Sequence, residues 1–528
     1  MIKERIAGNE LDPRRLDSEY YWHGYRRITS LIQGFESHGT FESLQVPSIP
    51  IRRGIDMPVI VDYPEAPYLI PIGSFEEPGL SEIGLEKIDP KQHEKFKGSK
   101  VSPGDLLVAM GGYVGKAAIV PKDFPNSNIG RHTARIVIDE AKVDKYFLWT
   151  FITSKVGNIY FERLVTGSVQ AGINLEDLKE IIIPLVHSKA QRYIGDKVRQ
   201  AECLRALGKR NRDFAFSSVR SLFSNAIGRT FELTANFSAK HSRIKSGQIV
   251  DRLDGWFYKK EFLDISELLA TLQTSGIGLK PIKEIGEVGY GFMPLEDYFS
   301  ENTGASFLRV TNIPNQLEFD LADVKYVNPQ ESNHPDYRLK YGDIFIVQLG
   351  NSTGRIGFIG KDLEGWVFPP FALRITNVST EWDSGFIAAF LASPLGQIQI
   401  QRSISITSVR PNTTKPAIEN ILIPTFPYEK QCKIGSAVRC SETARFFSSH
   451  LISFSKLLVE DLIEGMVSEN ELVVIQEALD CGDTEPEKAL FKRLSTKRLD
   501  VPGEPPLFPN PDDLYNLLRD AEPKDGIE

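Results

Sequence analysis

Hydrophobic and polar positions follow the same order twice along this chain of 528 residues. Each half opens with short apolar runs typical of strands, separated by glycine and proline, such as "DLLVAM" from Asp105 and "DIFIVQL" from Asp343. An amphipathic, helix-like segment follows at 147–164 in the first half and at 386–403 in the second. The pattern therefore predicts a β-rich portion followed by helix in both halves.

Each half closes in the same way. A short isoleucine-rich strand ends at Pro184 or Pro424, and a long proline-free stretch then predicts a helix, over 189–223 and 429–466. A helix of about 35 residues would be roughly 50 Å long. Its apolar stripes predict that the two helices pack on one another. The stripe residues are Ile194, Val198, Ala201, Leu204 and Leu207 in the first helix, and Phe447, Leu451, Phe454 and Leu458 in the second.

The two halves also share residues. Four pairs of segments match in the same order, and the offset between partners drifts only from 237 to 240 residues. Since chance rarely produces four collinear matches, the chain is a tandem duplication with a unit of about 240 residues. The matched segments start at Arg15 and Arg252, Gly104 and Gly342, Phe147 and Phe386, and Leu178 and Ile418.

Bulk composition is that of folded globular units, with 41% hydrophobic and 25% charged residues. No apolar run is long enough to cross a bilayer, and the N-terminal sequence lacks the apolar core of a secretion signal. We therefore expect a cytoplasmic protein without membrane contact. The cysteines are scattered without metal-binding spacing, so neither disulfides nor a zinc site is expected; they are Cys203, Cys432, Cys440 and Cys481.

Charge is unevenly distributed. The net charge is −8, yet 467–528 alone carries 15 acidic and 7 basic residues, which leaves 1–466 neutral. Within that neutral body, 189–229 holds 10 basic and 3 acidic residues. This basic segment is either a solvated helix face or a surface for DNA or an acidic partner. The acidic tail has no counterpart after the first repeat, and it carries short helical patterns over 472–479, 485–494 and 512–518.

No motif for catalysis is complete. "GGYVGKAA" resembles a phosphate-binding loop, but Met110 and Ala117 stand where that loop needs a glycine and a hydroxyl. "FPPF" at 368–371 lacks the Asp or Asn with which amino-methyltransferases open a similar tetrapeptide. No GxGxxG, GxSxG or HExxH pattern occurs either. The sequence therefore predicts no self-contained active site, no metal and no cofactor.

The order of "GDLLVAMGGYVGKAAIV", "TGSVQAGINLEDLKEIIIPL" and "KAQ", repeated in a duplicated chain, resembles the specificity subunits of type I restriction-modification systems. The resemblance covers about 10–465 and is closer in the first copy. It implies an α+β fold with two β-rich target-recognition domains, separated by two long antiparallel spacer helices, plus a C-terminal extension. The expected bounds are 1–187 and 233–427 for the recognition domains, 188–232 and 428–466 for the spacer helices, and 467–528 for the extension.

In that family the subunit is not an enzyme. The resemblance implies that it reads a bipartite site on double-stranded DNA and docks two methyltransferase subunits, which hold S-adenosylmethionine, and possibly an ATP-dependent restriction and translocation subunit. Because the copies differ strongly in their β-rich portions, we expect an asymmetric target. Restriction-modification and phage defence are the implied roles.

The resemblance also implies that polar side chains around the β-rich portions face DNA. We expect such contacts from a set of eleven residues: Lys116, Arg131, His132, Ser168, Gln170 and Asn174 in the first copy, and Arg355, Arg374, Ser408, Arg410 and Asn412 in the second. For each of these, a solvated surface side chain is the alternative.

The junction "TGSVQAGIN" at 166–174 leads from the recognition unit to the last strand and the long helix. In the second copy Gly167, Gln170 and Gly172 are replaced by Thr407, Arg410 and Asn412. A purely conformational need for glycine therefore does not explain the junction in both copies, and a polar segment near DNA remains equally open.

Two other functions stay open. The chain could be a specificity adaptor of another phage-defence assembly, with the tail recruiting the effector. It could also be a duplicated scaffold that joins proteins without reading DNA.

Overall fold

The computed structural model describes residues 18–166, 171–228, 244, 246–249, 254–296, 298, 304–321, 323–330, 334–404, 410–498 and 508–521. The chain forms two compact units. The first consists of Met1–Leu204 and Phe447–Glu528, and the second of Arg205–Phe446. Each unit includes part of both long helices, and the first also includes the tail. The bounds expected for the recognition domains therefore stay a prediction.

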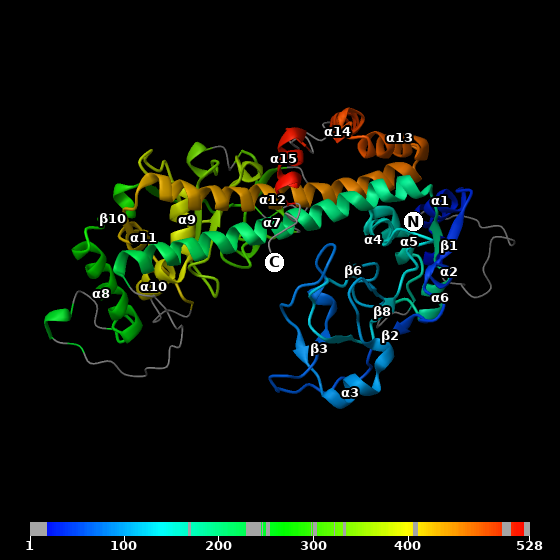
Figure 1. Ribbon diagram of the computed structural model, residues 1–528, viewed down its shortest axis with the longest axis horizontal. Coiled ribbons are helices and arrows are strands. Elements are labelled where there is room, and N and C mark those ends of the chain that lie inside the picture. Colours follow the sequence, from blue (N-terminus) through cyan, green and yellow to red (C-terminus); the bar gives the residue numbers. More distant parts are fainter. Residues whose placement is uncertain are drawn as a thin grey trace. The chain divides into compact units, whose positions relative to one another are not determined.

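The first unit combines short helices with short strands, as Figure 1 shows in blue and cyan. Its helices before the long α7 are α1 (His23–Gln33), α2 (Phe41–Leu44), α3 (Pro90–Lys95), α4 (Lys145–Thr153), α5 (Lys155–Glu162) and α6 (Leu175–Lys179). Its strands are β1 (His38–Thr40), β2 (Arg52–Arg53), β3 (Tyr68–Ile70), β4 (Glu86–Lys87), β5 (Leu106–Ala109), β6 (Ala117–Ile119), β7 (Ser127–Ile129), β8 (Thr133–Ile136) and β9 (Ile182–Pro184).

An antiparallel four-stranded sheet with the order β2-β8-β5-β6 carries the first unit. Its central strand β5 is buried at all four positions, which explains the continuous apolar run of the sequence. Leu106 lies opposite Ile136 on one side and Ile119 on the other. A second sheet has the order β4-β3-β7, and β1 pairs with β9.

The second unit repeats this plan. Its sheet has the order β11-β16-β14-β15, in which Ile344 of the central strand lies opposite Ile375 and Phe358. Its strands are β10 (Leu279–Pro281), β11 (Glu287–Tyr290), β12 (Ala305–Phe307), β13 (Lys325–Val327), β14 (Ile344–Val347), β15 (Ile356–Phe358), β16 (Ala372–Thr376) and β17 (Leu422–Pro424). Its shorter helices are α8 (Lys260–Thr274), α9 (Ser384–Ala392), α10 (Pro394–Ser403) and α11 (Lys415–Glu419).

Each of the two segments predicted to be amphipathic forms a pair of helices, α4 and α5 in the first unit and α9 and α10 in the second. Ser154 ends α4 and caps α5 by accepting a hydrogen bond from the Gly157 amide. A β-carbon on Gly157 would lie 1.9 Å from the Phe151 carbonyl oxygen, so the tight turn requires glycine. Because α4 is buried from Phe147 to Thr153, the segment has no polar face there.

The two long helices predicted from the apolar stripes are confirmed as α7 (Ser188–Ile227) and α12 (Tyr428–Ile463). All stripe residues are buried. Within the first unit the Ser448 hydroxyl donates to the Ala201 carbonyl oxygen at 2.9 Å, which joins the two helices. The expected mixed class of helix and sheet is therefore confirmed. Neither long helix, nor any other in the described residues, is long and apolar enough to cross a membrane.

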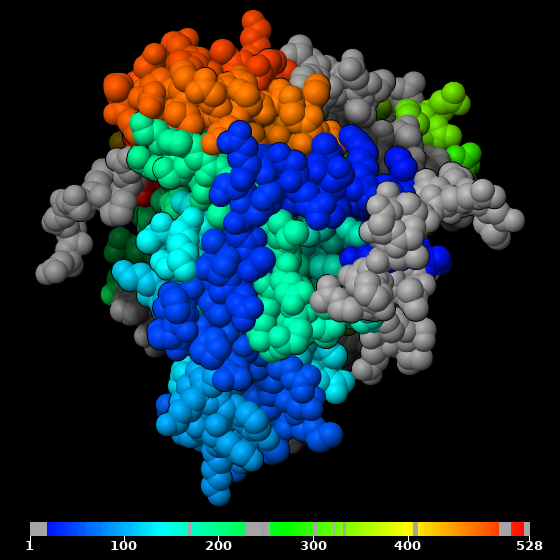
Figure 2. Space-filling model, turned by 90° about the vertical axis from the view of Figure 1, so that its right-hand side faces the viewer, coloured from blue at the N-terminus to red at the C-terminus, as the bar shows by residue number. Residues whose placement is uncertain are grey.

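The described residues of the acidic tail form three helices, which belong to the first unit. They are α13 (Glu469–Asp480), α14 (Glu485–Arg498) and α15 (Pro511–Ala521), each at one of the helical patterns of the sequence. Figure 2 shows the orange residues of the C-terminal region, which include the end of α12, above the teal beginning of α7 and the blue N-terminal segment. These three tail helices are thus folded parts of the first unit.

Candidate nucleic-acid interface

Three loops of the first unit meet at the end of β5. The Met110 amide donates to the His132 carbonyl oxygen, and the Ile173 amide donates to the Met110 carbonyl oxygen, both at 2.7 Å. Gly111 also forms an antiparallel bridge with Gly172. A β-carbon on Gly172 would lie 2.7 Å from the Met110 oxygen, so glycine permits this close approach. The junction segment therefore lies directly beside the sheet's loops.

Exposed cationic and aromatic side chains surround this meeting point. Lys116 lies over the ring of Tyr113 at 5.0 Å, and both are exposed. Arg131 donates from Nε to Nε2 of His132 at 2.8 Å, and its Nη1 lies 3.5 Å from Oδ1 of Asp56. Exposed cationic side chains beside a histidine suit phosphate or base-edge contacts. The structure thus brings three of the predicted residues onto adjoining loops.

The second unit builds the same meeting point with the same backbone hydrogen bonds. The Gln348 amide donates to the Phe371 oxygen at 2.9 Å, and the Thr413 amide donates to the Gln348 oxygen at 3.1 Å. Leu349 bridges Asn412 as Gly111 bridges Gly172. The loops after the edge strands β2 and β11 also share a close backbone contact. A β-carbon on Gly54 would lie 2.0 Å from the Ile129 carbonyl oxygen, and a β-carbon on Gly291 would lie 2.0 Å from the Phe368 carbonyl oxygen.

The side chains on this common backbone differ. Pro370 and Phe371 occupy the positions of Arg131 and His132, and the Phe371 ring is 40% exposed. Arg355 corresponds to Lys116, but it is half-buried and donates from Nη1 to the Ile313 carbonyl oxygen at 2.9 Å. The first unit therefore presents Arg131 and His132 where the second presents the Phe371 ring.

The junction residues divide between capping and surface positions. Asn174 caps α6 by accepting from the Asp177 amide at 2.8 Å, and its equivalent Thr414 caps α11. Arg410 is exposed. Asn412 is half-buried, and its Oδ1 has no hydrogen-bond partner in the described part of the chain. The predicted residues Ser168, Gln170 and Ser408 lie outside the described residues.

Arg374 is not on the surface, which corrects the prediction that it faces DNA. Its side chain is 6% exposed, it lies 3.6 Å from the Asp343 carboxylate, and it donates to the Arg338 carbonyl oxygen. Burial raises the pKa of Asp343, against the opposing effect of Arg374. The first unit has the same buried pair, with Nε of Arg135 2.5 Å from Asp105. This ion pair belongs to the sheet, since it recurs at equivalent strand positions.

A second duplicated arrangement joins each globular part to its long helix. In the first unit Gln191 accepts from the Asp144 amide at 2.9 Å and donates to the Val186 carbonyl oxygen at 2.7 Å. In the second unit Gln431 makes the same two bonds, with the Asp383 amide at 3.1 Å and with the Phe426 oxygen at 2.8 Å. The glutamine of "KAQ" is therefore a positioning residue.

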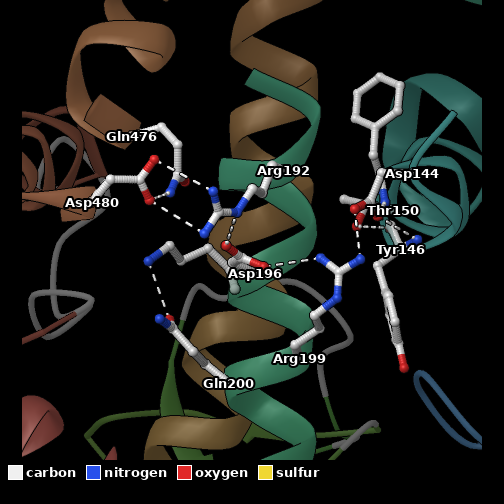
Figure 3. Close-up of polar contacts among 11 residues, drawn as sticks. Asp144, Tyr146, Thr150, Arg192, Asp196, Arg199, Gln200, Gln476 and Asp480 are labelled. Atoms are coloured by element: carbon white, nitrogen blue, oxygen red, sulfur yellow. Dashed lines mark hydrogen bonds and ion pairs between the residues drawn. The ribbon is translucent and has the colours of Figure 1, made fainter. Parts of the chain in front are cut away.

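Two further positions of each long helix hold the same aspartate. Figure 3 shows Arg199 reaching Asp144, at 2.6 Å, and its counterpart Arg439 lies 2.9 Å from Asp383. Gly195 lies between Gln191 and Arg199, and a β-carbon there would lie 2.5 Å from Asp144. The spacing Gln-x3-Gly-x3-Arg occurs in both copies. This shared spacing could have identified the arrangement from the sequence, but it was not among the predicted sites.

The acidic tail neutralises part of the basic segment at the start of α7. Lys189 pairs with Glu477 at 2.5 Å, and Arg192 pairs with Asp480 at 3.2 Å, as Figure 3 shows for Arg192. Lys197 forms a buried ion pair with Glu487. The sequence left open whether the basic segment faces DNA or an acidic partner. At the start of α7, the acidic partner is the tail of the same chain.

Within the described parts of the chain, no group of three or more histidine, cysteine, aspartate or glutamate side chains could hold a metal ion.

Part of the chain is similar to known specificity proteins of type I restriction-modification systems. Residues 73–208 match the family model "Type I restriction modification DNA specificity domain". The specificity subunit of the type I restriction enzyme EcoBI of Escherichia coli is 29% identical over 166 residues, which cover 31% of this chain and 35% of that subunit. The match thus spans about a third of the relative's length.

Solved structures of type I specificity subunits are also similar. The S subunit from M. genitalium shares 16% identity and the HsdS subunit from Thermoanaerobacter tengcongensis 13%, with TM-scores of 0.41 and 0.26, and each match covers 82% of this chain and 97% of the other. The resemblance to type I specificity subunits drawn from the sequence is confirmed by these matches, of which the family model covers residues 73–208.

Proposed function

We propose that this chain is a non-catalytic specificity subunit that recognises a two-part, asymmetric DNA sequence and docks methyltransferase subunits on its long helices. Methyl transfer belongs to those partners, which bind S-adenosylmethionine, and an ATP-dependent restriction subunit can join the same assembly. The family match of residues 73–208 supports the specificity role.

One observation carries the two-part target. The two units share backbone hydrogen bonds at the end of the central strand, yet Arg131 and His132 of one stand where Pro370 and Phe371 stand in the other. Cationic and imidazole groups favour phosphates and the acceptor atoms of guanine, whereas an exposed aromatic ring favours apolar contact such as the thymine methyl group. Two equivalent surfaces with different chemistry read two different half-sites.

Methylome sequencing tests this proposal. We expect cells that express the chain with its neighbouring methyltransferase to methylate a split motif with two unlike halves, and to lose that motif when the gene is deleted. A methylation pattern that is unchanged by the deletion would overturn the proposal.

DNA binding by the purified complex separates the scaffold alternative. A sequence-reading complex binds its motif more tightly than random DNA, and its affinity falls steeply with salt because cations are released from the phosphates. Binding without sequence preference and without salt dependence would favour the scaffold instead.

A further inference from the structure

A loop with the same exposed apolar side chains follows the edge strand of the central sheet in each unit. The sequence Gly-Ile-Asp-Met-Pro-Val follows β2 at 54–59, and Gly-Phe-Met-Pro-Leu follows β11 at 291–295. The apolar residue directly after the glycine is buried in both loops, since Ile55 is 1% exposed and Phe292 is 7% exposed. Each loop is therefore fixed to its unit just before the methionine.

The methionine and the residue after the proline are exposed instead. Met57 is 81% and Val59 50% exposed in the first unit, and Met293 is 54% and Leu295 90% exposed in the second. We call each Met-Pro-apolar triplet a methionine–proline tip. A single exposed apolar side chain is common on protein surfaces. Here the same exposed pair recurs at equivalent places in two copies that differ strongly in their β-rich portions, which points to a contact outside the chain.

Hydrogen bonds from amide side chains hold both loops. Gln92 of α3 donates from Nε2 to the Met57 carbonyl oxygen at 3.0 Å and accepts from the Val59 amide at 2.7 Å. In the second unit Asn328 donates to the carboxylate of Glu296, directly after the tip, at 3.2 Å. An ordered loop loses less conformational entropy when it contacts a partner.

Both tips lie beside the loops of the candidate nucleic-acid interface. Ile55 forms a parallel bridge with Gly130, and Oδ1 of Asp56 lies 3.5 Å from Nη1 of Arg131. In the second unit the Phe292 amide donates to the carbonyl oxygen of Phe368, which opens the loop that carries Phe371, at 3.0 Å. The tips therefore extend the same surface in both units.

The charge of the loops selects which part of DNA the tips can contact. Neither 54–63 nor 291–298 contains lysine or arginine, and the carboxylates of Asp56 and Glu296 flank the tips. Such loops offer nothing to attract phosphates. Their exposed apolar side chains instead match the apolar group that base edges present in the major groove, the C5 methyl group of thymine.

We propose that the two methionine–proline tips contact thymine methyl groups, one tip in each half of the DNA target. This inference rests on the proposed function and names a base that each half contains. Cations on the neighbouring loops, such as Lys116, contact phosphates and position the duplex, while the tips add base preference.

Uracil-substituted DNA tests this inference, because uracil lacks only the C5 methyl group of thymine and keeps its base pairing. The purified complex of the chain and its neighbouring methyltransferase is bound to duplexes with its motif, in which the thymines are replaced one at a time. We expect about 4-fold weaker binding for at least one replacement in each half, the value of one buried methyl group. The double variant Met57→Ser with Val59→Ser should abolish this uracil effect in one half only, and Met293→Ser with Leu295→Ser in the other half only.

Met466→Ser is the matched control, since this methionine is also 54% exposed but lies outside both tips, and both uracil effects should persist in it. Uracil effects that persist in the tip variants, or a half-site without thymine, would overturn the inference and leave the proposed function intact. Loss of the methyltransferase from a tip variant would also overturn it, by assigning the tips to a protein interface. A complex without preference for its motif would overturn the proposed function and the inference together.

Discussion

Single residues hold each globular part on its long helix in the same way in both units. Gln191 and Gln431 each satisfy one backbone amide and one carbonyl oxygen, and they sit one helical turn before a glycine that admits the aspartate carboxylate. A buried backbone group without a partner is costly, which explains why both copies use the same side chain for both bonds.

Replacing Gln431 by alanine should destabilise the second unit. The substitution leaves the Asp383 amide and the Phe426 oxygen without partners, and each unsatisfied group costs about 1–3 kcal/mol. We expect a lower midpoint of urea unfolding for this variant, whereas Lys430→Ala, at an exposed neighbouring position, should leave the midpoint in place. Equal midpoints for both variants would contradict the assigned role.

The buried carboxyl of Glu442 makes the second unit sensitive to pH. Burial raises its pKa from 4.5 to about 7, with Arg445 opposing the shift and Asp362 adding to it. Between these two values the folded protein keeps a proton that the unfolded chain has lost. Glu442 therefore contributes most to the free energy of unfolding below about pH 4.5. Its contribution falls as the pH rises to about 7, by about 1.4 kcal/mol for each unit of pKa difference.

Glu442→Gln tests this dependence. We expect the unfolding free energy of the natural chain to fall more between pH 5 and pH 8, the two chosen test conditions, than that of the variant. The exposed Glu429→Gln on the same helix serves as the control and should behave as the natural chain does. An unaltered pH slope in Glu442→Gln would show that Glu442 titrates normally.

At the scale of elements, the pattern of apolar residues predicted the helices and strands that depend on neighbouring residues in the sequence. The long helices follow from apolar stripes such as Leu451 and Leu458, and the strands β9 and β17 follow from isoleucine runs that end at proline. The break at Ser154 was missed, because α4 before it is buried on every side from Phe147 to Thr153 and has no polar face that ends at the break. The docking of the tail was also beyond the sequence, since Lys197 and Glu487 are 290 residues apart.

The Phe508 ring packs against Phe491 of α14 and Phe454 of α12, so Phe508→Ala should loosen the tail as an element. Removing a buried phenylalanine side chain costs about 3–5 kcal/mol. We expect faster hydrogen exchange in α15 and α14 while β5 and β14 keep their protection. Uniformly faster exchange throughout the first unit would instead mean that the tail and the sheet unfold together.

At the scale of the whole molecule, the duplication was readable but the surface was not. Chain comparison identified the repeat and the loops around Lys116, Arg131 and His132. It could not show that Arg374 is buried against Asp343. An arginine within a strand has the same sequence pattern whether its side chain is exposed or forms a buried ion pair. It also gave Asn174 as a DNA contact without predicting that this side chain caps α6, where it accepts from the Asp177 amide.

Independent reading of two half-sites makes a final prediction. Arg131→Ala combined with His132→Ala should relax base preference in only one half of the methylated motif, because the second unit carries none of these groups. Phe371→Ala should relax only the other half. Loss of one good base contact costs about 1–3 kcal/mol, which is about 5-fold to 150-fold in discrimination. Methylome sequencing of the two variants separates the halves, and a change in both halves from either variant would mean that the two units do not read DNA independently.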